Sequence, residues 1–173
     1  MKIKIENILK EGMLLDKYSD GASAEERIEG VPYINFPFEV ETKENYKYLS
    51  WVLVDHDSNP VVNFSWLHWV IANYELDTTT KVEENLVNST KKYVGGTNTF
   101  ASPLAKIKDK KVIYNYGGPT PPDKTHIYTL QVYAHNEKLN LTEGFYLNDL
   151  YQELTGKILE QDEIQIPAKC FKE

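Results

Sequence analysis

Five polar side chains stand inside or at the ends of apolar runs in this 173-residue sequence: Asp55, Asp57, His68, His126 and Tyr128. A polar group in apolar surroundings costs free energy unless it is hydrogen-bonded or used in chemistry. Side chains two positions apart on a strand face the same way, so the two acids share a face, and His126 shares one with Tyr128. The pattern predicts a site where carboxylates meet titratable rings.

The two acids are expected to accept hydrogen bonds from different partners. An acidic residue after a strand commonly caps a turn by accepting from backbone amides, so we expect either Asp55 or Asp57 to do so. The other is expected to accept from a histidine ring, which fixes the ring tautomer and raises the pKa of the histidine.

His68 has an alternative interpretation, because a lone histidine between tryptophans is usually a core residue bonded to a backbone carbonyl. Strand alternation places His68 on the face of Trp66 and Val70. The other face then carries Leu67 and Trp69. This arrangement lets His68 line the floor of a pocket while Trp69 packs in the core.

His126 is the stronger candidate because it follows a turn rich in glycine and proline, residues 117–122, whose rigidity would hold the ring in place. Prolines also end strands and block edge pairing, which is the simpler explanation of the turn. Adjacent glycines let backbone N–H groups converge on a concavity, so Gly117 and Gly118 predict a modest anion-binding nest.

Two histidines and a carboxylate also suit a facial metal site. The sequence contains no His-Glu-x-x-His pair and no glycine loop of the nucleotide-binding type. We therefore predict neither a metal nor an organic cofactor. His56 and His135 lie at strand ends and are expected to be exposed.

An alternative to a binding module is a hydrolase that acts on a small ester or phosphate ester, with His126 or His68 as general base. Such an enzyme needs a nucleophile or an aimed water. The candidates are Ser65, Ser102 and Thr125, and none lies in an elbow motif. The sequence therefore favours a binding module over an enzyme.

Most of the chain has the two-residue period of strands, with turn-rich stretches between them. The expected strands are residues 2–5, 33–40, 48–55, 65–73, 112–116, 125–134 and 163–167. One segment changes to helical spacing between Leu147 and Leu154, with Thr142 as the expected N-cap and Gly156 as the stop. We predict a mainly β fold, an antiparallel Greek-key β-sandwich of two sheets with one or two peripheral helices, the main one near the pocket rim.

Size and charge narrow the possible partners. Residues 1–173 suit a single domain with a full core. A formal net charge of −7 repels phosphate backbones and anionic lipid, so nucleic acid is not expected as a partner.

The N-terminus has no apolar stretch for a signal peptide or membrane span, and the single Cys170 excludes an internal disulfide. A cytoplasmic protein without integral membrane association is expected.

Five sequence signals occur in one characteristic order. They are DHD at 55–57, WLHW at 66–69, NTFASP at 98–103, the turn 117–122 leading to HIY at 126–128, and GFYL at 144–147. In this order they resemble the phosphatidylethanolamine-binding protein family, in particular its bacterial branch, often called Raf kinase inhibitor-like proteins. The resemblance runs from about residue 31 to 158. His56 departs from it where the family usually has proline, and Ile127 where it often has arginine.

The resemblance implies a small pocket that takes anions such as phosphate or phosphorylated head groups. It assigns the pocket to Asp55, His68, His126 and Tyr128, with Asp57 beside them and a wall formed by Gly118, Pro121 and Pro122. It also implies a protein that modulates kinases or proteases, with such an enzyme as a protein partner, and a homodimer.

Acidic residues in an anion pocket pose a problem of charge, because Ile127 supplies no positive charge beside Asp55. Protonated histidine and backbone amides are expected to compensate. We therefore predict that phosphate-type ligands bind more tightly at about pH 5.5 than at about pH 8.

Overall fold

The computed structural model describes residues 1–77 and 80–172, and strands dominate this part of the chain. The strands are β1 (Lys2–Lys4), β2 (Leu9–Lys10), β3 (Met13–Leu14), β4 (Arg27–Ile28), β5 (Val31–Pro32), β6 (Phe38–Glu41), β7 (Tyr48–Asp55), β8 (Trp66–Glu75), β9 (Lys81–Val82), β10 (Val94–Gly95), β11 (His126–His135) and β12 (Glu160–Ala168).

Helical segments are short and lie in the connections. The α-helices are α1 (Asn59–Val62), α2 (Lys110–Ile113) and α3 (Leu147–Leu154), and the 3-10 turns are η1 (Glu6–Ile8), η2 (Asp16–Tyr18), η3 (Ala24–Glu26), η4 (Leu86–Asn88) and η5 (Thr99–Ala101). No helix in residues 1–77 or 80–172 is long and apolar enough to cross a bilayer.

The described strands form one large and one small antiparallel sheet, with two further strand pairs, β2–β3 and β4–β5. The large sheet has the order β10-β8-β7-β11-β12, and the small sheet has the order β1-β6-β9. After β7, β8 and β10 the chain returns so that β11 lies beside β7, which is the strand order of a Greek key. The prediction of an antiparallel Greek-key sandwich is confirmed.

The main core lies between the two sheets. Trp51 of β7 and Trp69 of β8 meet with ring centroids 5.0 Å apart, and Phe38 of the small sheet packs edge-on to both. These three side chains are at most 3% exposed. Aromatic rings of this size bury much apolar area and favour edge-to-face packing. They hold the small sheet against the large one.

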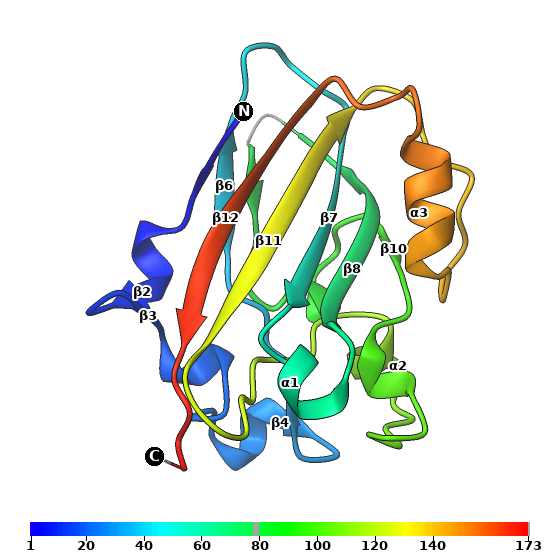
Figure 1. The fold of residues 1–173 in the computed structure, drawn as a ribbon. Coiled ribbons are helices and arrows are strands. Elements are labelled where there is room, and N and C mark those ends of the chain that lie inside the picture. Colours follow the sequence, from blue (N-terminus) through cyan, green and yellow to red (C-terminus); the bar gives the residue numbers. More distant parts are fainter. Residues whose placement is uncertain (78–79, 173) are drawn as a thin grey trace.

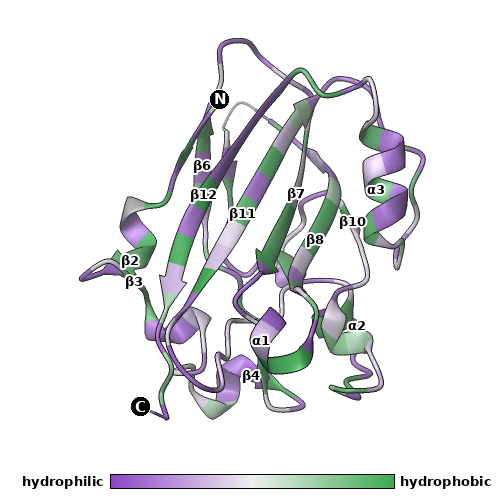
Figure 2. Ribbon diagram, in the orientation of Figure 1, coloured by the Kyte–Doolittle hydropathy of each residue, from purple (hydrophilic) through white to green (hydrophobic). Residues whose placement is uncertain are grey.

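A second apolar cluster covers the outer face of the large sheet. Val52 of β7 and Val70 of β8 pack there with Leu150 and Leu154 of α3. Both faces of β7 are therefore covered, which explains why this strand is an almost continuous apolar run. The edge strand β12 has one open face instead, because Gln161, Glu163 and Gln165 are exposed and the residues between them are less exposed. The strand is hydrophilic over its first half, and hydrophobic residues enter over its second half (Figure 2).

The helix α3 corrects one part of the prediction. It begins at Leu147, where the Asp149 carboxylate accepts from Tyr146 N (2.9 Å), so the N-cap is Tyr146 and not Thr142. It ends just before Gly156, whose φ of +77° is left-handed, so the predicted stop is right. The helix covers the outer face of the sheet, away from α1 (Figure 1).

The predicted strand at residues 112–116 is wrong, because the chain turns there into α2. Asp109 caps this short helix by accepting from Lys111 N (2.8 Å), and Val112 is fully buried. Of the predicted strand at 33–40 only the end is present, as β6, which begins at Phe38. The predicted strand at 48–55 coincides with β7, and the remaining predicted strands are present with shifted ends.

Candidate functional site

The loop that carries α1 connects β7 to β8 at one end of the large sheet (Figure 1). A cavity of about 140 Å³ opens beside this loop. Strand pairing aligns its floor, because Asp55 of β7 stands opposite Tyr128 of β11 on one side and Trp66 of β8 on the other. The cavity is lined by Asp55, Ser58, Val61, Val62, Trp66, His68, Phe100, Thr120, Pro122, His126 and Tyr128.

A bulge in β8 aims His68. Leu53 pairs with Trp69, but the next residue of β7, Val54, pairs with Leu67, so His68 is the extra residue of β8. The prediction that Leu67 shares the face of Trp69 is therefore wrong. Leu67 packs with the outer cluster around Val70, while Trp69 packs in the main core as expected.

His68 is buried and neutral. Its Nδ1 lies 2.7 Å from the Gly117 carbonyl oxygen, which can only accept, so Nδ1 carries the proton. Its ring meets Tyr128 and Phe100 edge-on. Burial lowers the pKa of His68 to about 4, although the carbonyl of Gly117 and the charge of Asp55 act in the other direction. His68 therefore adds no positive charge to the cavity at neutral pH.

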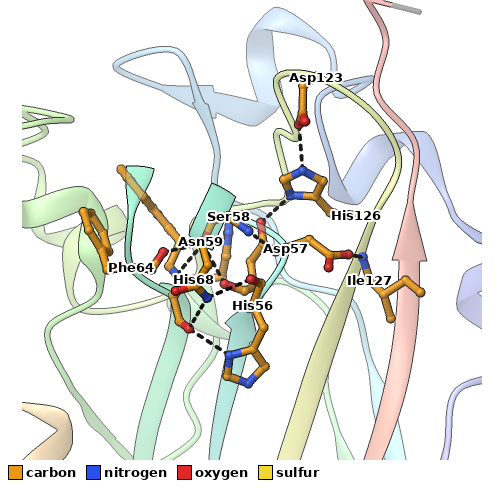
Figure 3. A network of polar contacts seen from close by, with 12 residues as sticks. His56, Asp57, Ser58, Asn59, Phe64, His68, Asp123, His126 and Ile127 are labelled. Carbon is orange, nitrogen blue, oxygen red and sulfur yellow. Dashed lines mark hydrogen bonds and ion pairs between the residues drawn. The ribbon is translucent and has the colours of Figure 1, made fainter. Parts of the chain in front are cut away.

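His126 lies between two carboxylates (Figure 3). Its Nδ1 is 2.7 Å from Asp55 Oδ2, and its Nε2 is 2.8 Å from Asp123 Oδ1. Ionised carboxylates only accept, so both ring nitrogens donate and the ring is an imidazolium. Burial lowers the pKa of His126, but the hydrogen bonds to Asp55 and Asp123 outweigh it and raise the pKa above its ordinary value.

The two carboxylates differ in their surroundings. Asp55 is 3% exposed, and besides His126 it accepts from Ser58 N (3.2 Å). It therefore performs both tasks that were expected to be divided between two acids. Asp123 is half-exposed, and the hydrogen bond from His126 lowers the pKa of its carboxyl group. Together with His126 the two acids leave one net negative charge.

Asp57 links the loop after β7 to strand β11 beside the cavity. Its Oδ2 accepts from Ile127 N at 2.8 Å (Figure 3), and it is not among the residues that line the cavity. The neighbouring His56, where the resembling family usually has proline, has its Nδ1 2.8 Å from Ser65 Oγ. The prediction that His56 is exposed is right.

The Gly/Pro turn contributes walls and packing. Pro122 lines the cavity, whereas Gly118 and Pro121 lie behind the lining and are buried. Gly117 N donates to His68 O and Gly118 N to Pro32 O, so neither amide is available for an anion and the predicted nest is not formed. A Cβ on Gly118 would lie 2.7 Å from Tyr18 O, which explains the glycine by close packing.

The loop between β7 and β8 forms the other wall. The Ser58 hydroxyl lies 2.7 Å from Phe64 O and 2.8 Å from Asp55 O, and it accepts from Trp66 N (3.0 Å). These bonds close the loop and place Val61 and Val62 against the cavity. The indole nitrogen of the lining residue Trp66 is buried and, within the described part of the chain, has no hydrogen-bond partner.

Tyr128 completes the polar floor. Burial, together with the neighbouring Asp55 carboxylate, raises the pKa of Tyr128 well above its ordinary value, so the phenol stays protonated. Within the described residues, no group of three or more histidine, cysteine or acidic side chains is arranged to hold a metal ion.

The sequence pattern indicated the strands that carry the site, but several lining residues have no recognisable signal in it. Ser58, Val61 and Val62 come from a loop that carried no recognised signal, and Phe100 stood within the NTFASP segment without an assigned role. Asp123 was also missed, although it lies three residues before His126, within reach of the ring.

The family model described as phosphatidylethanolamine-binding protein matches residues 6–168. The uncharacterised protein YxkA of Bacillus subtilis is 44% identical over 157 residues, which cover 90% of this chain and 94% of the relative. A UPF0098 protein of Chlamydia pneumoniae is 32% identical over 100 residues, or 57% of this chain and 56% of that protein.

Two solved structures share the fold. A phosphatidylethanolamine-binding protein homologue of Chlamydia trachomatis, CT736, superposes with a TM-score of 0.73 at 21% identity, covering 96% of this chain and 95% of the other. Escherichia coli YbcL, described as a new member of the mammalian family, superposes with a TM-score of 0.71 at 18% identity, covering 97% of each chain.

Proposed function

Because the chain belongs to the phosphatidylethanolamine-binding protein family, we propose that it is a binding module whose cavity takes a small anionic or phosphorylated group on His126. The observation that carries the proposal is the outer nitrogen of this ring. His126 is charged, buried and one of the residues that line the cavity, and its Nε2 already holds a carboxylate, that of the half-exposed Asp123. A charged N–H donor of this kind suits the oxygen of a phosphate or carboxylate ligand.

The size of the cavity supports a compact group. Its volume of about 140 Å³ corresponds to roughly four or five water molecules in the liquid. A phosphate with a short substituent matches this volume better than a nucleotide does. The walls formed by Val62, Trp66 and Phe100 suit carbon atoms of that substituent.

The charge that favours an anion comes from His126 in this proposal. His68 is neutral, and the amides of Gly117 and Gly118 are bonded to carbonyl oxygens. Binding is therefore expected to weaken as pH rises through the raised pKa of His126, because the ring then loses its proton. Below that pH the ring stays charged.

The hydrolase alternative has less support from the geometry. Ser58, the serine that lines the cavity, has its hydroxyl at main-chain carbonyl oxygens and not at a histidine nitrogen. Assays with phosphate esters and carboxylic esters test this alternative. Turnover that is lost in His126→Ala would establish it in place of the binding module.

A kinase or protease partner and a homodimer rest on the family resemblance alone and stay predictions. Light scattering of the purified protein tests the dimer. Inhibition assays with a panel of kinases and proteases test the regulatory role.

The test of the binding module is an NMR titration with phosphoethanolamine and with sulfate, whose charge is constant over the pH range. We expect shifts at His126 and Tyr128, and tighter binding at about pH 6 than at about pH 9. His126→Ala should lose at least about tenfold in affinity, as expected for a charged hydrogen bond.

His56→Ala is the matched control, because it removes an exposed histidine at the same end of the sheet that does not line the cavity. It should bind sulfate as the unmodified protein does. Equal affinity of the His126→Ala and His56→Ala variants would refute the proposed role of His126.

A further inference from the structure

The contact between Asp123 and His126 affects the affinity of the cavity for anions. Nε2 is the outer nitrogen of the ring, since Nδ1 is directed to the buried Asp55, and Asp123 occupies it at 2.8 Å. An N–H group donates one strong hydrogen bond, so an anion on Nε2 and the Asp123 carboxylate exclude each other. We propose that Asp123 is a built-in competitor that sets the affinity of the cavity for anions.

Exposure supports displacement of Asp123 and not of Asp55. The side chain of Asp123 is 50% exposed, so its carboxylate can turn into water at little cost in solvation. Asp55 is 5% exposed in its side chain and also holds Ser58 N, so removing it from the ring would leave a buried charge. The ligand therefore replaces the outer carboxylate while the inner one keeps its place.

Tethering makes the competition effective. Asp123 is only three residues from His126, and a group on so short a connection has an effective concentration in the millimolar range or above. A free anion must overcome this local concentration before it occupies Nε2. Asp123 therefore keeps weak anions off the ring, and the inference rests on the proposed function of His126.

Two opposite effects of Asp123 can be separated by pH. The groups that face His126 are Asp55 from β7, His68 from β8, Tyr128 from β11 and Asp123 from the preceding turn, and β12 places the uncharged Ala168 opposite. Removing Asp123 frees Nε2 but also withdraws a charge that favours the imidazolium. The gain in anion affinity should therefore be largest at about pH 6 and should shrink at about pH 8.

The experiment measures sulfate and acetate binding to Asp123→Ala by NMR titration at both pH values. We expect a two- to fivefold gain for both anions at about pH 6, the range for breaking a half-exposed ion pair. Competition predicts a similar factor for acetate and sulfate, because both displace the same carboxylate. The His126 pKa should fall in the variant.

Glu25→Ala is the control for net charge, because it removes an exposed acid from η3. It should leave both affinities unchanged. A gain for sulfate without one for acetate would overturn the proposal, since general electrostatics acts more strongly on a dianion. Unchanged or weaker binding in Asp123→Ala, with the unmodified protein binding sulfate, would overturn the competition alone. Absence of binding in both proteins would refute the proposed function and the competition together.

Discussion

Strand β11 has a histidine at each end, and one of the two rings is charged while the other is neutral. His126 begins the strand and His135 ends it, and both side chains are 0% exposed. At the cavity end both nitrogens of His126 meet carboxylates. At the far end His135 Nδ1 donates to Glu137 O (2.7 Å), and its Nε2 lies 2.8 Å from Ser50 Oγ.

The partners decide the charge of each ring. Burial lowers the pKa of His135, and its neutral partners do not reverse the effect. Burial also acts to lower the pKa of His126, but there the hydrogen bonds that the ring donates to two carboxylates raise it. Equal burial thus gives a neutral ring in a closed core network and a charged ring beside a cavity. The comparison indicates that acidic partners decide whether a histidine closed off from solvent is charged.

The largest expected effect is on stability, when one hydrogen-bond partner is removed from His126 and one from His135. Asp55→Ala breaks a buried charged pair and should lower the free energy of unfolding by about 3 kcal/mol. Ser50→Ala removes a neutral hydroxyl that also accepts from Asn73 N (3.2 Å), and it should cost about 1–2 kcal/mol. Urea unfolding at neutral pH measures both. A larger cost for Ser50→Ala than for Asp55→Ala would contradict the comparison.

Acid should destabilise the protein through its neutral histidines. The pKa of His68 is about 4 in the folded state and 6.5 in its ordinary state. The neutral His68 contributes fully to the free energy of unfolding above about pH 6.5. As pH falls toward 4, the free energy of unfolding decreases by up to about 3 kcal/mol, because the unfolded chain takes up the proton first. His135 acts in the same direction. His126 has the opposite sign, since its raised pKa gives stability below about pH 6.5 that is lost at higher pH.

His68→Gln should therefore flatten the loss of stability between about pH 6.5 and 4, as measured by urea unfolding across that range. The control His56→Gln, at an exposed ring, should keep the full loss. If His68→Gln lost as much stability between about pH 6.5 and 4 as the unmodified protein, His68 would not be held neutral by the fold.

Tyr128→Phe should have the smallest effect. The variant removes one hydroxyl from the cavity floor and should weaken sulfate binding by a few-fold, as for one neutral hydrogen bond. The dependence on pH should keep its slope, because the pKa of Tyr128 is raised well above its ordinary value and the phenol does not titrate in this range. An NMR titration at two pH values checks both statements. A changed slope would assign part of the titration to Tyr128.

The sequence was sufficient for the four long strands of the large sheet, β7, β8, β11 and β12, and for the part of the site that these strands carry. A nearly continuous apolar run predicted β7 with its exact bounds, and two-residue spacing placed His126 and Tyr128 on one face. Both depend on the local sequence. The bulge at His68 depends instead on how β8 pairs with β7, so simple alternation assigned Leu67 to the wrong side.

Other features depend on contacts distant in the sequence. His135 is buried because Ser50 and Glu137 close around it, although its place at a strand end predicted exposure. The glycines of the turn are explained by Phe100 and by Tyr18 O, whose positions follow from packing and not from the local sequence. Tertiary contacts of this kind have no periodic signal.

The central claim is that two carboxylates keep the buried His126 charged while the equally buried His135 stays neutral. Two-dimensional NMR of the imidazole nitrogens at about pH 7, just above the ordinary histidine pKa, tests it directly. We expect both ring nitrogens of His126 to be protonated, and His135 and His68 each to have one protonated nitrogen. An unprotonated nitrogen on His126, or a fully protonated His135, would contradict the account.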